Sequence, residues 1–154
     1  DMDEQHQSQN IIGQIRAPEQ DMFLEEIARL ANLGVGQWIT INVSGVNVCG
    51  RTMSGRDYFT RIADQVGRSD FTGNTGDIDF AKILSDNYRD YTRIYDKPED
   101  AGEDWTPPKP GYLHLEMARI LTPNGSSIPS SKDLLWRGRL SSIDGFSLAQ
   151  IEQS

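Results

Sequence analysis

The stretch LLWRGRLSSIDGFSL, residues 134–148, decides more about the fold than any other part of the chain. In its first half, arginines alternate with leucine and tryptophan side chains, which is the two-residue period of a strand with one buried face. Asp144-Gly145 is a strong signal for a two-residue hairpin turn, and apolar residues resume at Phe146. The stretch therefore predicts a β-hairpin whose return strand begins after the turn.

Other stretches show the same period earlier in the chain. Residues 38–43 alternate apolar and polar side chains, and the Ser44-Gly45 turn separates them from a second short strand that contains Gly50. A glycine inside a strand marks a bulge or a close approach of the backbone. Tyr112 to Leu121 alternates again, with Met117 expected on the same side as the leucines. Together with the hairpin, these stretches predict a sheet of about five strands.

Three segments have the period of amphipathic helices. The first runs from Pro18 to Leu33, with Phe23 expected on its buried face, and Gly34 suits its C-terminal cap. The second begins at Ser54, and the third spans 78–95 beyond a glycine-rich loop at 67–77. The predicted fold is therefore α+β, a small antiparallel sheet or partly open barrel with about three helices.

Length and composition fit one domain. The chain has 154 residues, of which 36% are hydrophobic, enough for one core. We expect a flexible tail over 1–15 and a single α+β domain over 16–154, with an acidic, proline-rich linker at 96–110. One cysteine and no long apolar segment indicate a protein of the reducing cytoplasm without a membrane span.

The inventory of reactive side chains predicts no catalytic, cofactor or metal site. Cys49 is expected to be buried in its strand, and His114 has no second histidine or cysteine at metal-ligand spacing. A phosphate-binding loop, a serine elbow and a dinucleotide fingerprint are all missing. An enzyme of unfamiliar type would need a pocket that brings Cys49 or His114 beside a carboxylate.

The C-terminal motif resembles the signature of the gas vesicle accessory protein GvpU family. The residues that carry the likeness are Trp136-Arg137-Gly138-Arg139-Leu140, Ile143-Asp144-Gly145-Phe146 and Leu148. Earlier motifs follow in the same order: Ile41-Asn42-Val43 with Gly45, Cys49-Gly50 before Met53-Ser54 and Tyr58-Phe59, and Leu113-His114-Leu115 before a serine and proline loop. The likeness covers most of residues 38–151, whereas 1–15 and 96–110 match nothing in it.

This resemblance implies a cytoplasmic, gas vesicle associated accessory protein that is not an enzyme and has no cofactor. It would act in gas vesicle formation or clustering. Its partners would be vesicle shell proteins or other accessory proteins, and self-association would gather vesicles through many weak contacts.

A second, architectural likeness is to Sm-like small barrels, many of which are RNA-binding rings. It rests on the order of helix, strand, glycine turn, glycine-containing strand and a later strand with Arg-Gly. The formal net charge of −8 argues against nucleic acid as a partner, as does the long insertion before the third strand.

Within the C-terminal motif we predict a partner-binding surface formed by Trp136, Arg137, Arg139, Asp144 and Phe146. Trp136 and Phe146 would be anchors in the core or in an interface. Arg137 and Arg139 share the opposite face of the strand. There they would either pair with acidic residues across the sheet or contact a partner.

Overall fold

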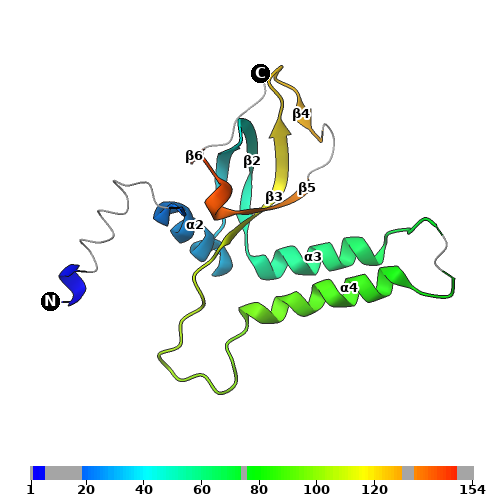
Figure 1. The fold of residues 1–154 in the computed structure, drawn as a ribbon, viewed down its shortest axis with the longest axis horizontal. Coiled ribbons are helices and arrows are strands. Elements are labelled where there is room, and N and C mark those ends of the chain that lie inside the picture. The colour runs from blue at the N-terminus through cyan, green and yellow to red at the C-terminus, as the bar shows by residue number, and fades with distance from the viewer. Residues whose placement is uncertain (1, 6–18, 74–75, 130–133, 149–154) are drawn as a thin grey trace.

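The computed structural model describes residues 2–5, 19–73, 76–129 and 134–148. Within these ranges the chain is α+β, as predicted, with a six-stranded antiparallel sheet that is not closed (Figure 1). The elements in chain order are α2 (Met22–Asn32), β1 (Trp38–Val43), β2 (Val46–Met53), α3 (Gly55–Gly67), α4 (Phe80–Asp90), the 3-10 helix η1 (Tyr91–Tyr95), β3 (Tyr112–Leu121), β4 (Ser127–Ile128), β5 (Leu134–Arg139), the 3-10 helix η2 (Leu140–Ser142) and β6 (Gly145–Ser147). The short strand β4 was not predicted.

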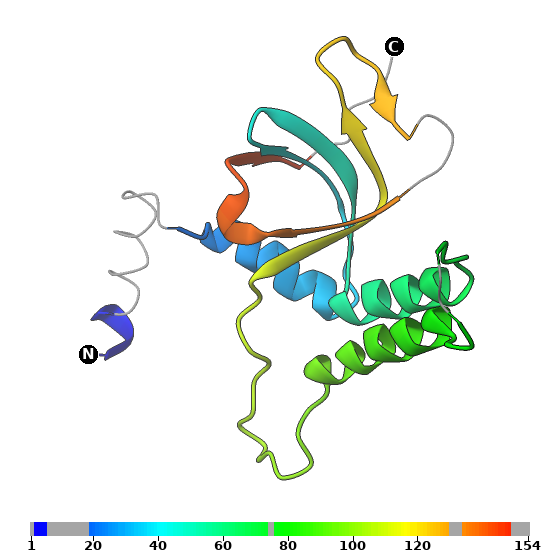
Figure 2. The same cartoon turned by 45° about the vertical axis from the view of Figure 1, so that its right-hand side comes forward.

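The sheet is organised around its long strands. Its order is β4-β3-β2-β1-β6, and β5 also pairs with β3. Figure 2 shows β2 and β3 curving, with α2 lying close to the sheet. The core between α2 and the sheet contains Leu24, Ile27, Ala28, Ile39, Ile41, Val48, Leu113, Leu115, Ala118 and Leu140. Burial of these side chains is the main force that holds helix and sheet together.

The first helix begins later than predicted. Asp21 is its N-cap, and the carboxylate accepts hydrogen bonds from the backbone N–H groups of Phe23 and Leu24. This start turns Leu24 into the core and leaves Phe23 63% exposed, so the prediction that Phe23 is buried was wrong. The predicted cap at Gly34 is confirmed, because this residue has a φ of +94° that favours glycine. The predicted first-turn residue Pro18 lies outside the described residues.

A bulge between β2 and β3 shifts which side chains reach the core. The pairing register changes between Cys49 and Arg51, and a Cβ at Gly50 would lie 3.0 Å from the Glu116 carbonyl oxygen. The predicted bulge at Gly50 is thus confirmed. Across from it, Met117 has a φ of +49°, and Ala118 instead of Met117 joins the buried leucines. The uninterrupted alternation predicted for this strand was therefore wrong, because a bulge adds one residue to the period.

The predicted C-terminal hairpin was also wrong. The strand β5 pairs with β3, while β6 pairs with β1 at the other side of the sheet. Between them Leu140, only 1% exposed, enters the core, and its N–H donates to the Gly111 carbonyl. Burial of Leu140 carries the chain across the end of the sheet. Asp144-Gly145 therefore leads into β6 instead of turning back on β5.

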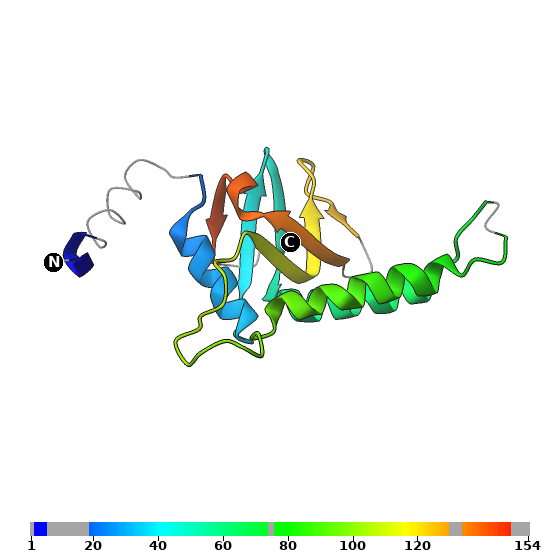
Figure 3. The same cartoon turned by 60° about the horizontal axis from the view of Figure 1, so that its bottom comes forward.

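The helices α3 and α4 form a helical hairpin that extends beyond the sheet (Figure 3). Ser54 caps α3 by accepting from the Asp57 N–H at 3.0 Å, which confirms the predicted start. Asp79 caps α4 by accepting from the Lys82 N–H at 3.1 Å. The predicted third helix, 78–95, is divided into α4 and η1.

Residues 96–111 contain no helix or strand. The end of this loop is tied to the α2 region, because Lys109 Nζ lies 3.0 Å from Glu25 Oε1 and Gln20 Nε2 donates to the Pro110 carbonyl. The role of 96–110 as a linker stays a prediction. So does the division at residue 15, since residues 1 and 6–18 lie outside the described ranges.

Candidate protein-interaction surface

Arg137 is held at the junction between the sheet and the helical hairpin. Its Nε donates to His114 Nε2 at 3.2 Å, across the β5–β3 pairing. The guanidinium carbon lies 3.5 Å from the ring centroid of Tyr112 and 5.5 Å from that of Phe59. Cation–π contacts with two rings and one hydrogen bond fix the position of the guanidinium. Among the described residues, no acceptor other than His114 takes a hydrogen bond from this guanidinium, which leaves N–H groups for a partner.

His114 is the buried partner in this arrangement. The residue is 4% exposed, and its ring centroid lies 4.7 Å from that of Tyr58 and 5.9 Å from that of Phe59. Burial and the adjacent Arg137 charge lower the pKa of His114 to about 4. At neutral pH the imidazole is therefore uncharged, and its Nε2 accepts from Arg137. On its other side the imidazole packs against the aromatic rings of Tyr58 and Phe59 from α3.

Arg137 and Arg139 are both exposed. Among the residues that the structure describes, no carboxylate lies within 4.0 Å of either guanidinium. The alternative in which both arginines pair with acids across the sheet is thus not realised in this part of the chain. In a protein of net charge −8, two such cations are a suitable contact for acidic groups of a partner.

The other predicted surface residues have structural contacts. Trp136 and Phe146 are half-buried and pack against the core. A Cβ at Gly138 would lie 2.3 Å from Trp136 Cη2, so the indole lies across this glycine. Asp144 Oδ2 accepts from the Ser44 N–H at 2.8 Å and so caps the turn between β1 and β2. A partner contact by Trp136, Asp144 or Phe146 stays a prediction.

Aromatic residues around Arg137 were not predicted as a group, because they come from three separate elements. The Tyr91 ring centroid lies 5.3 Å from that of Phe59. The Tyr95 hydroxyl occupies the space beside Gly55, where a Cβ would lie 1.8 Å from it. Burial raises the pKa values of Tyr58 and Tyr95, and the Arg137 charge opposes that rise. The only signal in the sequence is the three- and four-residue spacing of the tyrosines, which indicates packing.

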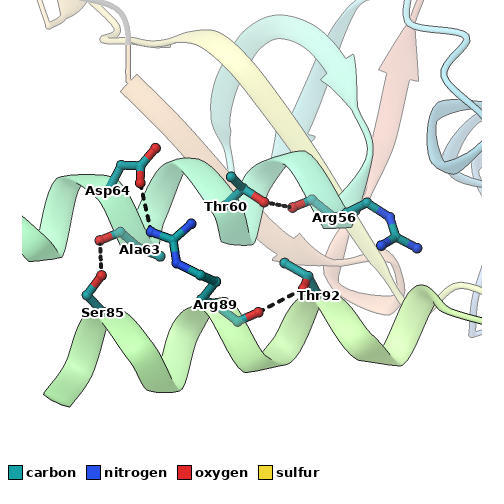
Figure 4. Close-up of polar contacts among 7 residues, drawn as sticks. All are labelled: Arg56, Thr60, Ala63, Asp64, Ser85, Arg89 and Thr92. Atoms are coloured by element: carbon teal, nitrogen blue, oxygen red, sulfur yellow. Dashed lines mark hydrogen bonds and ion pairs between the residues drawn. The ribbon is translucent and has the colours of Figure 1, made fainter. Parts of the chain in front are cut away.

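Polar contacts hold α3 and α4 together (Figure 4). Ser85, which is 9% exposed, donates from its hydroxyl to the Ala63 carbonyl at 2.7 Å. Nearby, Arg89 Nη2 lies 2.9 Å from Asp64 Oδ1 in an exposed ion pair. These contacts fix one side of α4 against α3. Within the described ranges they leave another side of α4 and η1 uncovered, where Phe80, Ile83 and Ile94 are exposed.

The described residues do not bring together a set of catalytic groups. Cys49 is buried as predicted. His114 pairs with Met53 of β2, and Cys49 lies four residues from Met53 along this strand, a separation of roughly 13 Å. No group of three or more histidine, cysteine or acidic side chains is placed to hold a metal ion in these ranges. A cavity of about 130 Å³ has Arg51, Asp57 and Glu116 among its lining residues. Its lining contains neither Cys49 nor His114.

Fold and surface together define a small α+β protein with an open sheet, a projecting helical hairpin and an exposed, aromatic-bound arginine. The family model described as gas vesicle protein GvpU-like matches residues 21–151, from the N-cap of α2 to beyond β6. The chain belongs to the GvpU-like family of gas vesicle proteins, which confirms the resemblance. No curated protein and no solved structure matches. Among the described helices, none is long and apolar enough to cross a membrane.

Proposed function

We propose that this protein is a cytoplasmic accessory protein that acts in gas vesicle formation or clustering through protein–protein contacts and self-association, and not through catalysis. Membership of the GvpU-like family carries the proposal, because the matched range contains both the sheet and the helical hairpin. The partners are vesicle shell proteins or other accessory proteins.

Arg137 and Arg139 are the residues that we assign to the contact. Arg137 is positioned by Tyr112 and His114 before any partner binds, so little side-chain entropy is lost on binding. Both guanidinium groups can meet acidic groups on the partner. Because these cations are exposed, the contact should weaken as salt is raised.

Flotation tests the proposal directly, since gas-filled vesicles rise during slow centrifugation and carry bound protein with them. The native protein should rise with purified vesicles, and Arg139→Glu should lower the bound fraction at least several-fold through loss of an exposed charge. Lys97→Glu, in the loop before β3, is the control with the same change in charge. Native protein that stays below the vesicles at every salt concentration would refute the function, and equal flotation of both variants would refute the assigned residues.

The alternative function is an Sm-like RNA-binding ring. One observation favours it: α2 precedes a curved sheet whose first strands are joined by the tight Ser44-Gly45 turn. Net charge −8 opposes it. Tight, salt-sensitive retention of uridine-rich RNA on filters would support the ring, and absence of binding at low salt would exclude it.

A further inference from the structure

One side of α4 and η1 presents a line of exposed residues, which we call the α4 stripe: Phe80, Ile83, Asn87, Tyr91 and Ile94. Apart from Asn87 they are large hydrophobic or aromatic residues, 38–58% exposed. Successive members are three or four residues apart, the spacing that places side chains on one face of a helix. Because η1 is a 3-10 helix, its residues 91 and 94 share one face as well.

Most of this stripe is exposed in the described part of the chain: the Tyr91 ring packs beside Phe59 of α3, yet Tyr91 is still 51% exposed. The side of α4 that contacts α3 carries Ser85 and Arg89 instead. At the tip of the helical hairpin, the apolar surface widens, because the Phe71 ring centroid lies 6.5 Å from that of Phe80. Ile78 lies at the same tip and is 54% exposed. An apolar surface thus runs along the projecting hairpin for about 21 Å.

The order of residues in the stripe indicates what covers it. The intervals between successive members are three, four, four and three residues, so their spacing is symmetric about Asn87. In an antiparallel pair of α4 segments centred on Asn87, Phe80 would face Ile94. Ile83 would face Tyr91 in the same pairing, and both contacts would occur twice. A surface that is complementary to itself under a two-fold rotation is what a symmetric dimer requires.

We propose that a second copy of this chain covers the α4 stripe, in an antiparallel, two-fold symmetric contact centred on Asn87. The proposal deepens the self-association in the proposed function and rests on it, by naming the partner and the surface. In this contact the two Asn87 amides lie on the symmetry axis, where each can donate to and accept from the other. A single polar residue within an apolar helix interface fixes its register.

The size of the surface fits this occupant. Six side chains, Phe71, Ile78, Phe80, Ile83, Tyr91 and Ile94, are each about half exposed. They offer roughly 600 Å² per copy if a large side chain presents about 200 Å². A stable interface buries about 800 Å² per partner. The polar residues beside the stripe can supply the remaining area as a rim.

The charge of the helical hairpin also permits two copies to meet. Residues 55–95 contain six basic and seven acidic residues, so this part is nearly neutral although the whole chain has a net charge of −8. Flanking charges are paired within the hairpin, Lys82 with Asp86 and Arg93 with Asp90. Repulsion between identical chains is therefore weak at this part of the surface.

The first test is the mass of the purified protein by sedimentation equilibrium. The native chain should have twice its monomer mass of 17.3 kDa at micromolar concentrations. Phe80→Glu should raise the dimer dissociation constant at least a hundredfold. The matched control is Phe23→Glu, because both phenylalanines are exposed and lie in the first turn of a helix. Native protein that is monomeric at all concentrations, or equal effects of the two variants, would overturn the proposal.

A second test uses the symmetry axis and does not depend on the apolar residues. Asn87 is exposed, so Asn87→Lys and Asn87→Glu should each fold but dissociate, because like charges meet at the axis. Mixed in equal amounts, these two variants should recover a dimer that contains one of each. Gln65→Lys, at an exposed position on α3, is the control and should remain dimeric. Failure of the mixture to pair would place the interface elsewhere.

The two proposals fail in distinguishable ways. A native protein that floats with vesicles but sediments as a monomer would retain the proposed function and lose the dimer. A native dimer that does not float with vesicles would retain the α4 interface and lose the assigned function.

Discussion

At the residue scale, the Trp-Arg-Gly-Arg motif packs Trp136 against the core and leaves its two arginines exposed. Gly138 leaves space for the Trp136 indole, while Arg137 points to the aromatic rings of Tyr112 and Phe59. A strand places neighbouring side chains on opposite faces, so one short motif can do both. The sequence alone predicted this alternation. It did not predict the rings beneath Arg137, because Phe59 is 78 residues away along the chain.

His114 makes stability depend on pH. Its pKa is lowered to about 4 in the folded protein, against 6.5 as the ordinary value, so the unfolded chain binds more protons between these values. Folding is therefore favoured above pH 6.5, and this contribution is lost as the pH falls toward 4. The expected loss is about 3 kcal/mol over the whole window, of which about 2 kcal/mol falls between pH 7 and pH 5. Urea denaturation of the native protein and of His114→Gln at pH 7 and pH 5 measures it.

The substitution keeps an acceptor for Arg137 and removes the titration. His114→Gln should therefore lose less stability than the native protein between these two pH values, where most exposed carboxyl groups stay ionised. Parallel slopes for the two proteins would show that His114 does not cause the pH dependence.

At the scale of elements, the stability of the helical hairpin depends more on the buried Ser85 hydroxyl than on the exposed ion pair between Arg89 and Asp64. Ser85→Ala leaves the Ala63 carbonyl without its side-chain partner and should cost about 1 kcal/mol of unfolding free energy. Arg89→Met breaks an exposed pair with Asp64 and should cost less than about 0.5 kcal/mol. Thermal or urea denaturation compares them. A larger loss for Arg89→Met would reverse this ranking.

The elements themselves were largely predictable, whereas two of their connections were not. Local signals such as the Ser54 cap, the Gly34 cap and the Gly50 bulge are confirmed because each depends on nearby residues. The Asp144-Gly145 signal failed because its outcome depends on a distant contact. The backbone N–H of Asp144 donates to the Asn42 carbonyl, and Leu140 is buried in the core. Tertiary packing decided the pairing there.

The same distinction applies to the candidate surface. Alternation correctly placed Arg137 and Arg139 on one exposed strand face. The α4 stripe was visible in the sequence only as part of an amphipathic helix. Whether such a stripe is covered depends on the arrangement of α3 and the sheet, which no local pattern records.

At the scale of the whole molecule, the two proposed contacts lie on different parts of the fold. Arg137 and Arg139 belong to β5, and the α4 stripe belongs to the helical hairpin. A dimer joined through the stripe would present two copies of the arginine surface. Two linked sites bind neighbouring surfaces with an avidity that one site lacks.

Vesicle clustering should therefore need the dimer, whereas vesicle binding should not. Asn87→Lys should still float with vesicles but should reduce the mean cluster size several-fold, and Gln65→Lys should match the native protein. Light microscopy of purified vesicles with each protein measures cluster size. Normal clustering by a variant shown to be monomeric would separate clustering from the α4 contact.

The crossing of the chain from β5 to β6 has a consequence for synthesis. The strand β1 ends at residue 43, yet its neighbour β6 begins at residue 145. A ribosome releases β1 and β2 long before β6, so the outer edge of β1 stays open while about a hundred residues are added. An unpaired edge can join another chain. The nascent protein is thus exposed to misassembly at this edge until β6 emerges.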